Sequence, residues 1–302
     1  MKILITGGAG FIGSNLVKKL EKENEVVVLD NFSTGKREYL SNCKATVING
    51  DLRNKELVLK ATKDIEVVIH LAAHTSVIES IENPSFDFEN NVIGTLNLLE
   101  ASFKNKVEKF IFDSYNAVIG DPLYVPIDEK HPVKPKSPYG ASKLAAEGYC
   151  TAFAEKGLHT VILRFANVYG INMDNKTSVI PLFINRILNH EPPIIYGDGN
   201  QTRDFIHVQD IVESIILSIE NGKSGSIYQI GTQVETSINE LCQYLLEISG
   251  SDLNPIYKPK RKGEIKRNYS MIQKAKQELG YDPSVYLREG LKEVFEYFRT
   301  RI

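Results

Sequence analysis

Short apolar runs alternate with helix-length segments through the first half of the chain. Most of these runs are rich in β-branched residues and apolar throughout; they are Ile3–Ile5, Val26–Leu29, Thr46–Ile48, Val67–Ile69, Phe110–Phe112 and Val161–Leu163. Strands that are buried on both faces of a parallel sheet have this pattern, and helices between them form βαβ units. The pattern predicts an α/β fold with a Rossmann-type doubly wound parallel sheet over residues 1–168.

The pattern changes after Gly170, where helix-length segments are separated by loops with proline and glycine. We expect a smaller C-terminal lobe made of residues 169–203 and 232–302, with a segment near 204–231 returning to the first sheet. Ser237 and Glu240 predict a capping box, and Asn83-Pro84 predicts a helix start in the first half. The expected helices of the second half lie at roughly 179–190, 209–220, 237–248 and 286–299.

The composition narrows the class of protein. Of the 302 residues, 42% are hydrophobic and 25% are charged, and the net charge is -2. This is typical of a globular protein and predicts no nucleic-acid surface. No apolar run approaches ~18 residues, so we expect no membrane span. Cys43, Cys150 and Cys242 are widely spaced, so we expect reduced thiols, no bound metal and a cytoplasmic location.

A glycine-rich turn follows the first predicted strand. Gly7, Gly10 and Gly13 come after Lys2–Thr6, and a predicted helix opens in the same stretch. Glycines at these steps allow a tight turn, a close backbone approach to a pyrophosphate and helix–sheet packing, while the helix N-terminus offers free N–H groups. Because strand, loop and helix follow one another in the required order, the sequence predicts a dinucleotide site.

An acidic residue ends the second predicted strand. Asp30 follows Val26–Leu29, and a carboxylate in this place accepts hydrogen bonds from the adenosine ribose and repels an added 2′-phosphate. Lys36 and Arg37 lie close by in the sequence and favour the phosphate-bearing cofactor. On balance the pattern favours NAD over NADP.

Motifs ordered along nearly the whole chain resemble one protein family. They are residues 6–13 (TGGAGFIG), 29–31 (LDN), 50–52 (GDL), 70–73 (HLAA), 91–95 (NVIGT), 139–143 (YGASK), 164–170 (RFANVYG) and 203–205 (RDF). Together they resemble the extended short-chain dehydrogenases/reductases, and among these the UDP-glucose and UDP-N-acetylglucosamine 4-epimerases. The resemblance implies a C-terminal lobe that binds a UDP-sugar, and a homodimer built on the helices at roughly 84–104 and 138–156.

The resemblance also implies which residues hold NAD. They follow the carboxyl ends of the predicted strands in turn: Gly7, Gly10, Phe11, Ile12 and Gly13, then Asp30, Asn31, Phe32, Ser33, Thr34 and Gly35, then Asp51, Leu52, Leu71, Ala72, Ala73, Asn91, Tyr139 and Lys143.

Tyr139 and Lys143 lie four residues apart on a predicted helix and so share a face. A phenol has a pKa near ~10, and an ammonium and a positively charged nicotinamide beside it lower that pKa. Tyr139 is then expected to take a proton from the C4 hydroxyl of the sugar while hydride passes to NAD. The 4-keto sugar turns over and is reduced on its other face, with no net redox change.

The segment 112–120 departs from the family pattern. Relatives carry a catalytic Ser or Thr five residues before the glycine, and counting back from Gly120 reaches Tyr115, with Ser114 beside it. Either hydroxyl is a candidate for this catalytic and substrate contact. Sugar-nucleotide 4,6-dehydratases carry Asp-Glu directly after the Ser or Thr, whereas this chain has Asn116-Ala117. A dehydratase is therefore disfavoured.

The remaining substrate residues are implied by the resemblance alone. Arginine binds phosphate oxygens with both charge and geometry, and Arg203 and Arg261 match the diphosphate and uridine contacts of the family. Glu264 matches the residue that binds the uridine ribose. The other expected contacts are Thr75, Asn167, and Ile195 and Tyr196 in a strand that passes the uracil.

One position is expected to gate the sugar pocket. In related 4-epimerases it lies five residues after the glycine of an Arg-x-Gly-Asp/Glu motif, where Tyr excludes an N-acetyl group and a smaller residue admits it. Counting from Gly263 reaches Asn268, with Tyr269 adjacent. We therefore expect UDP-GlcNAc/UDP-GalNAc interconversion. The alternatives are UDP-glucose/UDP-galactose epimerisation, a UDP-glucuronate epimerase or decarboxylase, a net oxidoreductase, and a non-catalytic NAD-binding regulator.

Overall fold

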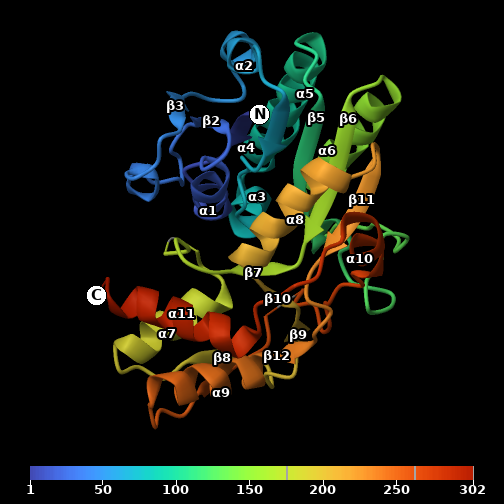
Figure 1. Cartoon of the computed structure of the whole chain (residues 1–302). Helices are drawn as coiled ribbons and strands as arrows, with labels where there is room; N and C mark the ends of the chain where they lie inside the picture. Colours follow the sequence, from blue (N-terminus) through green and yellow to red (C-terminus); the bar gives the residue numbers. More distant parts are fainter. Residues whose placement is uncertain (175, 262, 302) are drawn as a thin grey trace.

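The computed structural model describes residues 1–174, 176–261 and 263–301. At its centre lies a seven-stranded sheet in which every neighbouring pair is parallel. The strand order is β11-β6-β5-β4-β1-β2-β3 (Figure 1). The strands are β1 (Lys2–Thr6), β2 (Glu25–Asp30), β3 (Thr46–Asn49), β4 (Val67–His70), β5 (Lys109–Tyr115), β6 (His159–Phe165) and β11 (Ser226–Ile230). The expected doubly wound Rossmann sheet is thus confirmed.

The strand order reverses direction at β1, which has β4 on one side and β2 on the other. In open parallel sheets, ligands bind beyond the carboxyl ends of the strands at such a switch point. The inner strands bury both of their faces, whereas the edge strand β3 is mostly exposed. In β1, Ile3 and Ile5 pack in one hydrophobic core and Leu4 packs in the other. The apolar runs of the sequence have this physical cause.

Helices cover both faces of the sheet. On one face lie α1 (Phe11–Leu20), α8 (Val208–Asn221) and α10 (Gln273–Leu279). On the other lie α2 (Lys55–Ala61), α5 (Gly94–Lys104) and α6 (Pro138–Glu155). Short helical segments complete this part: η1 (Arg37–Leu40), α3 (Val77–Glu82), α4 (Pro84–Phe88), η2 (Glu89–Ile93) and η3 (Asn116–Val118).

The helix predicted over 84–104 starts where expected but is not continuous. The Asn83 side chain accepts a hydrogen bond from the Phe86 N–H at 3.1 Å and caps α4. The backbone then passes through the π-helical turn η2 before α5 begins. A π turn carries one extra residue per turn and often marks a functional position. Here it contains Asn91.

The remaining elements form the C-terminal lobe. Strands pair as β7 (Asn167–Tyr169) with β10 (Phe205–His207), β8 (Ile194–Tyr196) with β13 (Ile256–Lys258), and β9 (Thr202–Arg203) with β12 (Thr236–Ser237). The helices α7 (Val179–Leu188), α9 (Ile238–Ser249) and α11 (Leu287–Arg299) pack around a separate core, at the bottom of Figure 1. The predicted helices are confirmed to within two residues at each end, as is the capping box of Ser237 and Glu240.

The chain crosses between the two parts more often than expected. α8 and β11 pack on or join the first sheet. α10 also packs on α8 and β11 and contributes Ala275 and Leu279 to the sheet core, although it lies within the stretch assigned to the smaller lobe. A seven-residue helix carries too little periodicity to reveal which core it joins.

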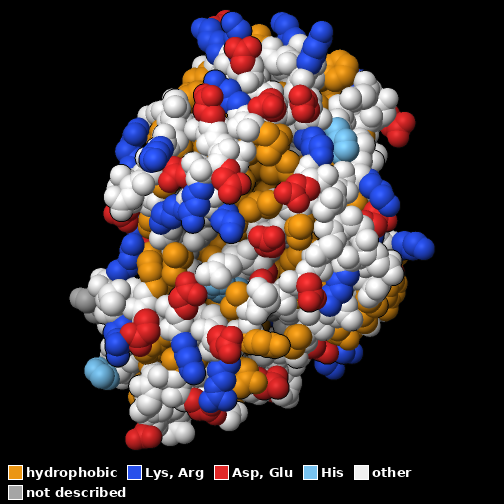
Figure 2. All heavy atoms as spheres, in the orientation of Figure 1, with side chains coloured by type: hydrophobic (Ala, Val, Ile, Leu, Met, Phe, Trp, Pro, Cys, Tyr) orange, Lys and Arg blue, Asp and Glu red, His pale blue; other side chains and the backbone are white. Residues whose placement is uncertain are grey.

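The surface is mixed in charge. Figure 2 shows acidic and basic side chains interspersed over the face seen in Figure 1, with hydrophobic side chains between them. Among the described residues, no helix combines the length and apolar character that crossing a bilayer requires. The described residues also contain no group of histidine, cysteine or acidic side chains that could hold a metal ion.

Candidate active site

The glycine turn holds the backbone of three elements together. Gly7 has φ +70°, and a Cβ built on it would lie 2.7 Å from the backbone nitrogen of Ala72. A Cβ on Gly13 would lie 2.2 Å from the Gly7 carbonyl oxygen. No side chain caps the N-terminus of α1 at Gly10, where Phe11 and Ile12 open the helix. The free N–H groups and this close approach fit a pyrophosphate.

The Asp30 carboxylate is tied to backbone on two sides. One oxygen accepts a hydrogen bond from the Ala9 N–H at 2.9 Å, and the other accepts one from the Phe32 N–H at 2.8 Å. Burial raises the pKa of Asp30, and these two hydrogen bonds act against that rise. Each carboxylate oxygen has two lone pairs, so the group can hold the turn and still accept bonds from ribose hydroxyls.

The two cations that favoured NADP are engaged elsewhere. The Lys36 ammonium lies 3.7 Å from the Asp174 carboxylate and 3.5 Å from Glu38. The Arg37 guanidinium stacks 4.1 Å from the centre of the Phe32 ring. Lys36 and Arg37 thus already have partners, so their charges are less available to the 2′-phosphate of NADP. This agrees with the choice of NAD.

The loop after β2 is braced against the loop after β3. The Asn31 amide donates to Asp51 at 3.1 Å, and its carbonyl accepts from the Ser33 N–H at 3.0 Å. Arg53 binds both oxygens of Asp51 and lowers its pKa. Thr34 and Gly35 follow in the same loop, and Leu52, which is buried, lies beside Gly94. The predicted adenosine contacts are therefore brought together.

Asn91 fixes the loop that follows β4. Its amide bonds the backbone N–H and carbonyl of His74 at 2.8 and 2.9 Å, and also donates to Asp87 at 2.9 Å. Leu71 and Ala72 are held to Thr6 at the end of β1, with Ala73 next in the chain. Asn91 thus contributes to the cofactor site indirectly, because it holds the loop after β4 in place.

These residues together fit NAD. The turn of Gly7 to Gly13 would hold the pyrophosphate, Asp30 the adenosine ribose, and the loop 71–73 the nicotinamide side of the cleft. When bound there, NAD supplies a hydride acceptor and donor.

The catalytic pair lies on α6 and is almost fully buried. The Lys143 ammonium donates to the backbone carbonyl of Asp113 at 2.7 Å. The backbone N–H of Tyr139 donates to the Ser80 hydroxyl at 3.2 Å. In the chain alone, burial, then Asp113, Tyr115 and Asp87, raise the pKa of Tyr139. The lowering of the Tyr139 pKa that was expected from Lys143 does not outweigh these effects.

The structure separates the two candidate hydroxyls of β5. Successive side chains of a strand point to opposite faces, and here Tyr115 donates to the Asn167 carbonyl at 2.7 Å. Ser114 is fully buried and donates to Glu147 at 2.6 Å. Glu147 in turn binds Arg164. Of the two, the geometry favours Tyr115 as the group that meets the substrate.

Two charged residues of the site were missed by sequence reasoning. Asp113 lies two residues before Tyr115, and its carboxylate is 3.9 Å from the Lys143 ammonium. Lys176 approaches from the segment after β7 and donates to the Thr75 hydroxyl at 3.3 Å. The two-residue period of a strand could have indicated Asp113. A lysine in a loop gives no such signal.

The expected diphosphate and uridine contacts form a connected group. Arg203 is partly buried and lies in the field of both Tyr115 and Glu264. The Gln201 amide bridges Glu264, at 3.2 Å, and the backbone of Tyr196, at 2.8 Å. The Arg261 guanidinium stacks 3.9 Å from the centre of the Tyr196 ring. One oxygen of Glu264 is buried without a partner among the described residues, so it is available to a ligand.

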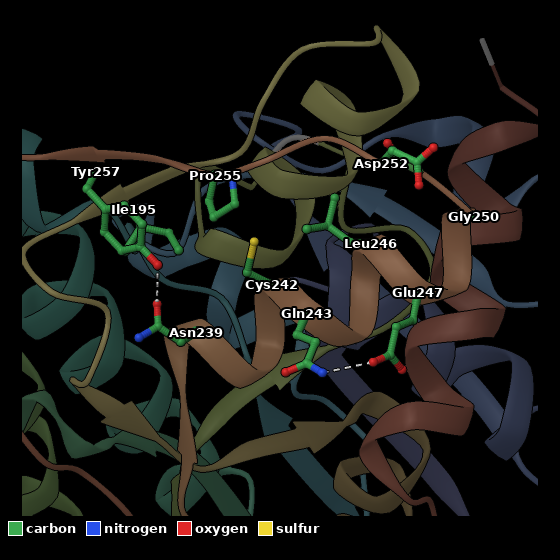
Figure 3. Close-up of a pocket in the computed structure, with 11 residues that line it drawn as sticks. Ile195, Asn239, Cys242, Gln243, Leu246, Glu247, Gly250, Asp252, Pro255 and Tyr257 are labelled. Atoms are coloured by element: carbon green, nitrogen blue, oxygen red, sulfur yellow. Dashed lines mark hydrogen bonds between the residues drawn. The ribbon is translucent and has the colours of Figure 1, made fainter.

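Ile195 faces the other way. Its side chain is buried in the core of the C-terminal lobe and lines a cavity of about 520 Å³ beside α9. Figure 3 shows this cavity, with Cys242 and Leu246 of α9 on one side and Pro255 and Tyr257 on the other. Ile195 can therefore reach a uracil on the Tyr196 side of β8 through its backbone, and the cavity lies behind that strand.

The structure buries Asn268, the expected gate residue, beside the segment that carries Tyr115. The Asn268 side chain is buried, and its carbonyl accepts a long hydrogen bond of 3.5 Å from the amide of Asn116, which follows Tyr115 directly. Tyr269 is half-buried, and its ring lies 5.7 Å from the Arg267 guanidinium. A one-residue slip in the count is thus disfavoured.

The comparisons with known proteins show the family of the chain. Residues 3–231 match the sequence model of the NAD dependent epimerase/dehydratase family. The chain is similar to UDP-glucose 4-epimerase of Mycolicibacterium smegmatis, with 35% identity over 315 residues, 100% of this chain and 99% of the relative. The chain therefore belongs to the NAD-dependent epimerase/dehydratase family of extended short-chain dehydrogenases/reductases, and NAD is its cofactor.

Two solved structures are similar over the whole fold. The crystal structure of UDP-glucose 4-epimerase with UDP-glucose from Thermotoga maritima shares 41% identity and a TM-score of 0.96, covering 100% of this chain and 99% of that one. UDP-N-acetylglucosamine 4-epimerase from Methanobrevibacter ruminantium, in complex with UDP-N-acetylmuramic acid, shares 36% identity and a TM-score of 0.96, with the same coverage.

The Tyr115–Asn167 contact predicts a contrast between two substitutions. Tyr115→Phe removes the hydroxyl that faces the site, and we expect kcat to fall by roughly 10-fold or more, on the scale of one positioned proton donor. Ser114→Ala removes a buried hydrogen bond to Glu147, and we expect lower thermal stability with kcat within about 3-fold of the parent. Steady-state kinetics and thermal unfolding separate the two. A larger loss of kcat in Ser114→Ala would reverse the assignment.

Asp30 predicts the choice of cofactor. Asp30→Ala removes a ribose acceptor and two backbone hydrogen bonds of the turn, so NAD should bind roughly 10- to 100-fold more weakly. NADP should be affected much less, because the negative charge that repels its phosphate is also lost. Calorimetric titration of NAD-free protein with each cofactor measures both. A parent protein that binds NADP more tightly than NAD would contradict the role of Asp30.

Proposed function

We propose that the chain is a UDP-sugar 4-epimerase that inverts C4 through a transient 4-keto intermediate and favours UDP-GlcNAc/UDP-GalNAc. The observation that carries the proposal is the group of side chains at the carboxyl end of β5: Tyr139 and Lys143 are buried on α6, Lys143 binds the Asp113 carbonyl, and Tyr115 binds Asn167. The names of the relatives support the 4-epimerase reaction. UDP-glucose/UDP-galactose is the second candidate substrate pair.

One set of residues is expected to bind the UDP part of the substrate, and another to carry out the proton transfers at the sugar. Arg203 and Arg261 supply positive charge for the diphosphate, and Glu264 supplies an unpaired buried oxygen for the uridine ribose. Tyr139 takes up the proton of the C4 hydroxyl and later returns it, and Tyr115 donates to the C4 oxygen in place of its bond to Asn167. Firm binding at the UDP end leaves the sugar able to turn over between the two half-reactions.

The preference for an N-acetylated sugar rests on Asn268. Asparagine is much smaller than tyrosine, so it leaves room for a 2-acetamido group. Among the residues that the structure describes, its side-chain oxygen accepts one long hydrogen bond, from Asn116, and its N–H groups are able to bond the acetamido group. A pocket that pairs a polar group discriminates better than one that leaves space. Room does not exclude the smaller sugar, so we expect UDP-glucose to remain a substrate.

A dimer and a cytoplasmic location complete the proposal. Large apolar side chains are exposed on four neighbouring helices, α3 to α6: Val77, Ile78, Ile81, Phe86, Phe88, Phe103 and Tyr149. Contiguous exposed apolar surface of this kind marks an interface. The three cysteines are free, which supports a reducing compartment.

Asn268→Tyr tests the substrate preference. The bulky phenol should abolish turnover of UDP-GlcNAc while UDP-galactose is still converted, because only the acetamido group needs the space that Asn268 leaves. The stereochemistry at C4 is followed by NMR with UDP-Glc, UDP-GlcNAc and UDP-GlcA. Asn268→Ala is the matched control: it keeps the space, so both substrates should still be converted, with a higher KM for UDP-GlcNAc because the amide bond is lost. Equal loss of both substrates in Asn268→Tyr, or a parent enzyme inactive on UDP-GlcNAc, would refute the gate.

The proposed dimer is tested by introducing negative charges on the exposed apolar surface of α3 to α6. Phe103→Glu combined with Tyr149→Glu should convert a protein of twice the chain mass into one of a single chain, measured by sedimentation equilibrium, because two chains would bury unpaired carboxylates. Tyr286→Glu, at an equally apolar position exposed on the other lobe, is the control and should stay dimeric. A monomeric parent protein would show the proposal to be wrong.

A further inference from the structure

Asp113 is a charged group in the catalytic centre to which the proposed reaction assigns no role. It shares a face of β5 with Tyr115, because the two are two residues apart. The Lys143 ammonium donates to its backbone carbonyl at 2.7 Å and lies 3.9 Å from its carboxylate. The side chains of Lys143 and Asp113 are 3% and 15% exposed, so their charges interact with little screening by water.

The carboxylate of Asp113 accepts no hydrogen bond from any residue that the structure describes. Burial raises its pKa to about 6, and the charges of Lys143 and Lys176 act against that rise. A buried carboxylate without donors is costly in free energy. Buried ionisable groups with shifted pKa values are concentrated at functional sites, where their charge takes part in binding or catalysis.

Four ionisable groups face Asp113, from each element around it. Lys143 and Tyr139 come from α6, Tyr115 from the same strand, and Lys176 from the segment after β7. The two cations balance its charge. The two phenols are made harder to ionise by it.

We propose that Asp113 is a positioning residue that anchors the Lys143 ammonium and sets the charge acting on the Tyr139 phenol. The inference rests on the proposed 4-epimerase reaction, in which Tyr139 must first accept a proton and then return it. A group that does both needs a pKa near the working pH. After burial, the Asp113 carboxylate is the largest cause that raises the pKa of Tyr139. A positive charge beside the phenol, such as that of a bound nicotinamide, would act in the opposite direction. Asp113 thus keeps Tyr139 able to give the proton back.

Asp113→Asn tests this role, because it removes the charge and keeps both the size and the backbone carbonyl that binds Lys143. Phenolate absorbance is titrated in the NAD-bound protein, and Tyr139 is isolated by subtracting the same titration of the Tyr139→Phe form of each protein. The Tyr139 transition should move to lower pH by about one unit, a roughly tenfold change in phenolate fraction. The acid limb of kcat/KM should move in the same direction.

The controls separate a charge effect from a structural one. Asp252→Asn, on the exposed surface of the other lobe, should leave both titrations unchanged. A lower rate in Asp113→Asn with an unmoved Tyr139 transition and an unmoved acid limb would overturn the proposal. The phenolate titration needs no sugar. A protein that shows the shift but epimerises no UDP-sugar would therefore contradict the proposed function and leave the charge effect intact.

A second variant keeps the proposal testable if Asp113→Asn fails to fold. Lys176→Gln removes a cation that lowers the pKa of Asp113. The Asp113 carboxyl, followed by its ¹³C chemical shift and identified by comparison with the other carboxyl signals, should then titrate at higher pH than in the parent. An unchanged midpoint would show that Lys176 does not face Asp113, and would overturn the charge arrangement proposed here.

Discussion

A buried ion pair fixes the catalytic helix on the sheet. Arg164 of β6 donates two hydrogen bonds, of 2.8 and 2.7 Å, to the two oxygens of Glu147 on α6, and Ser114 of β5 donates a third to the same carboxylate. Removing one partner of such a pair costs roughly 3–5 kcal/mol, because a charge is left buried and unpaired. Lys143 lies one helical turn before Glu147, and Tyr139 lies one turn before that. The ion pair therefore sets where both catalytic side chains stand relative to β5.

The same strand divides structure from chemistry by its pleat. Ser114 faces α6 and belongs to the ion-pair network, while Asp113 and Tyr115 lie on the other face, near Asn167 and Lys176. A Tyr in place of the family's Ser or Thr brings its hydroxyl farther from the backbone. Its bond to Asn167 holds that longer side chain in one orientation. The Tyr that departs from the family pattern is thus positioned by a hydrogen bond to Asn167.

The segment after β7 joins the two parts of the molecule around the cleft. Asp174 binds Tyr39 of η1, Tyr297 and Arg301 near the C-terminus, and lies close to Lys36. Asn172 donates to Ser14 of α1 at 3.0 Å. Because these partners come from both parts, the segment holds them at a fixed separation.

The sequence by itself determined the order of strands and helices, the glycine turn with Asp30, and the Tyr139–Lys143 pair. Each is a local pattern: buried parallel strands are apolar throughout, and a tight turn demands glycine at fixed steps. Only the tertiary structure gave Tyr115 and Ser114 different partners on opposite faces of β5, placed Asn268 beside Asn116, and brought Asp113 and Lys176 to the expected catalytic pair. Those relations depend on which face a side chain takes and on contacts between residues far apart in the chain. Neither leaves a periodic signal in the sequence.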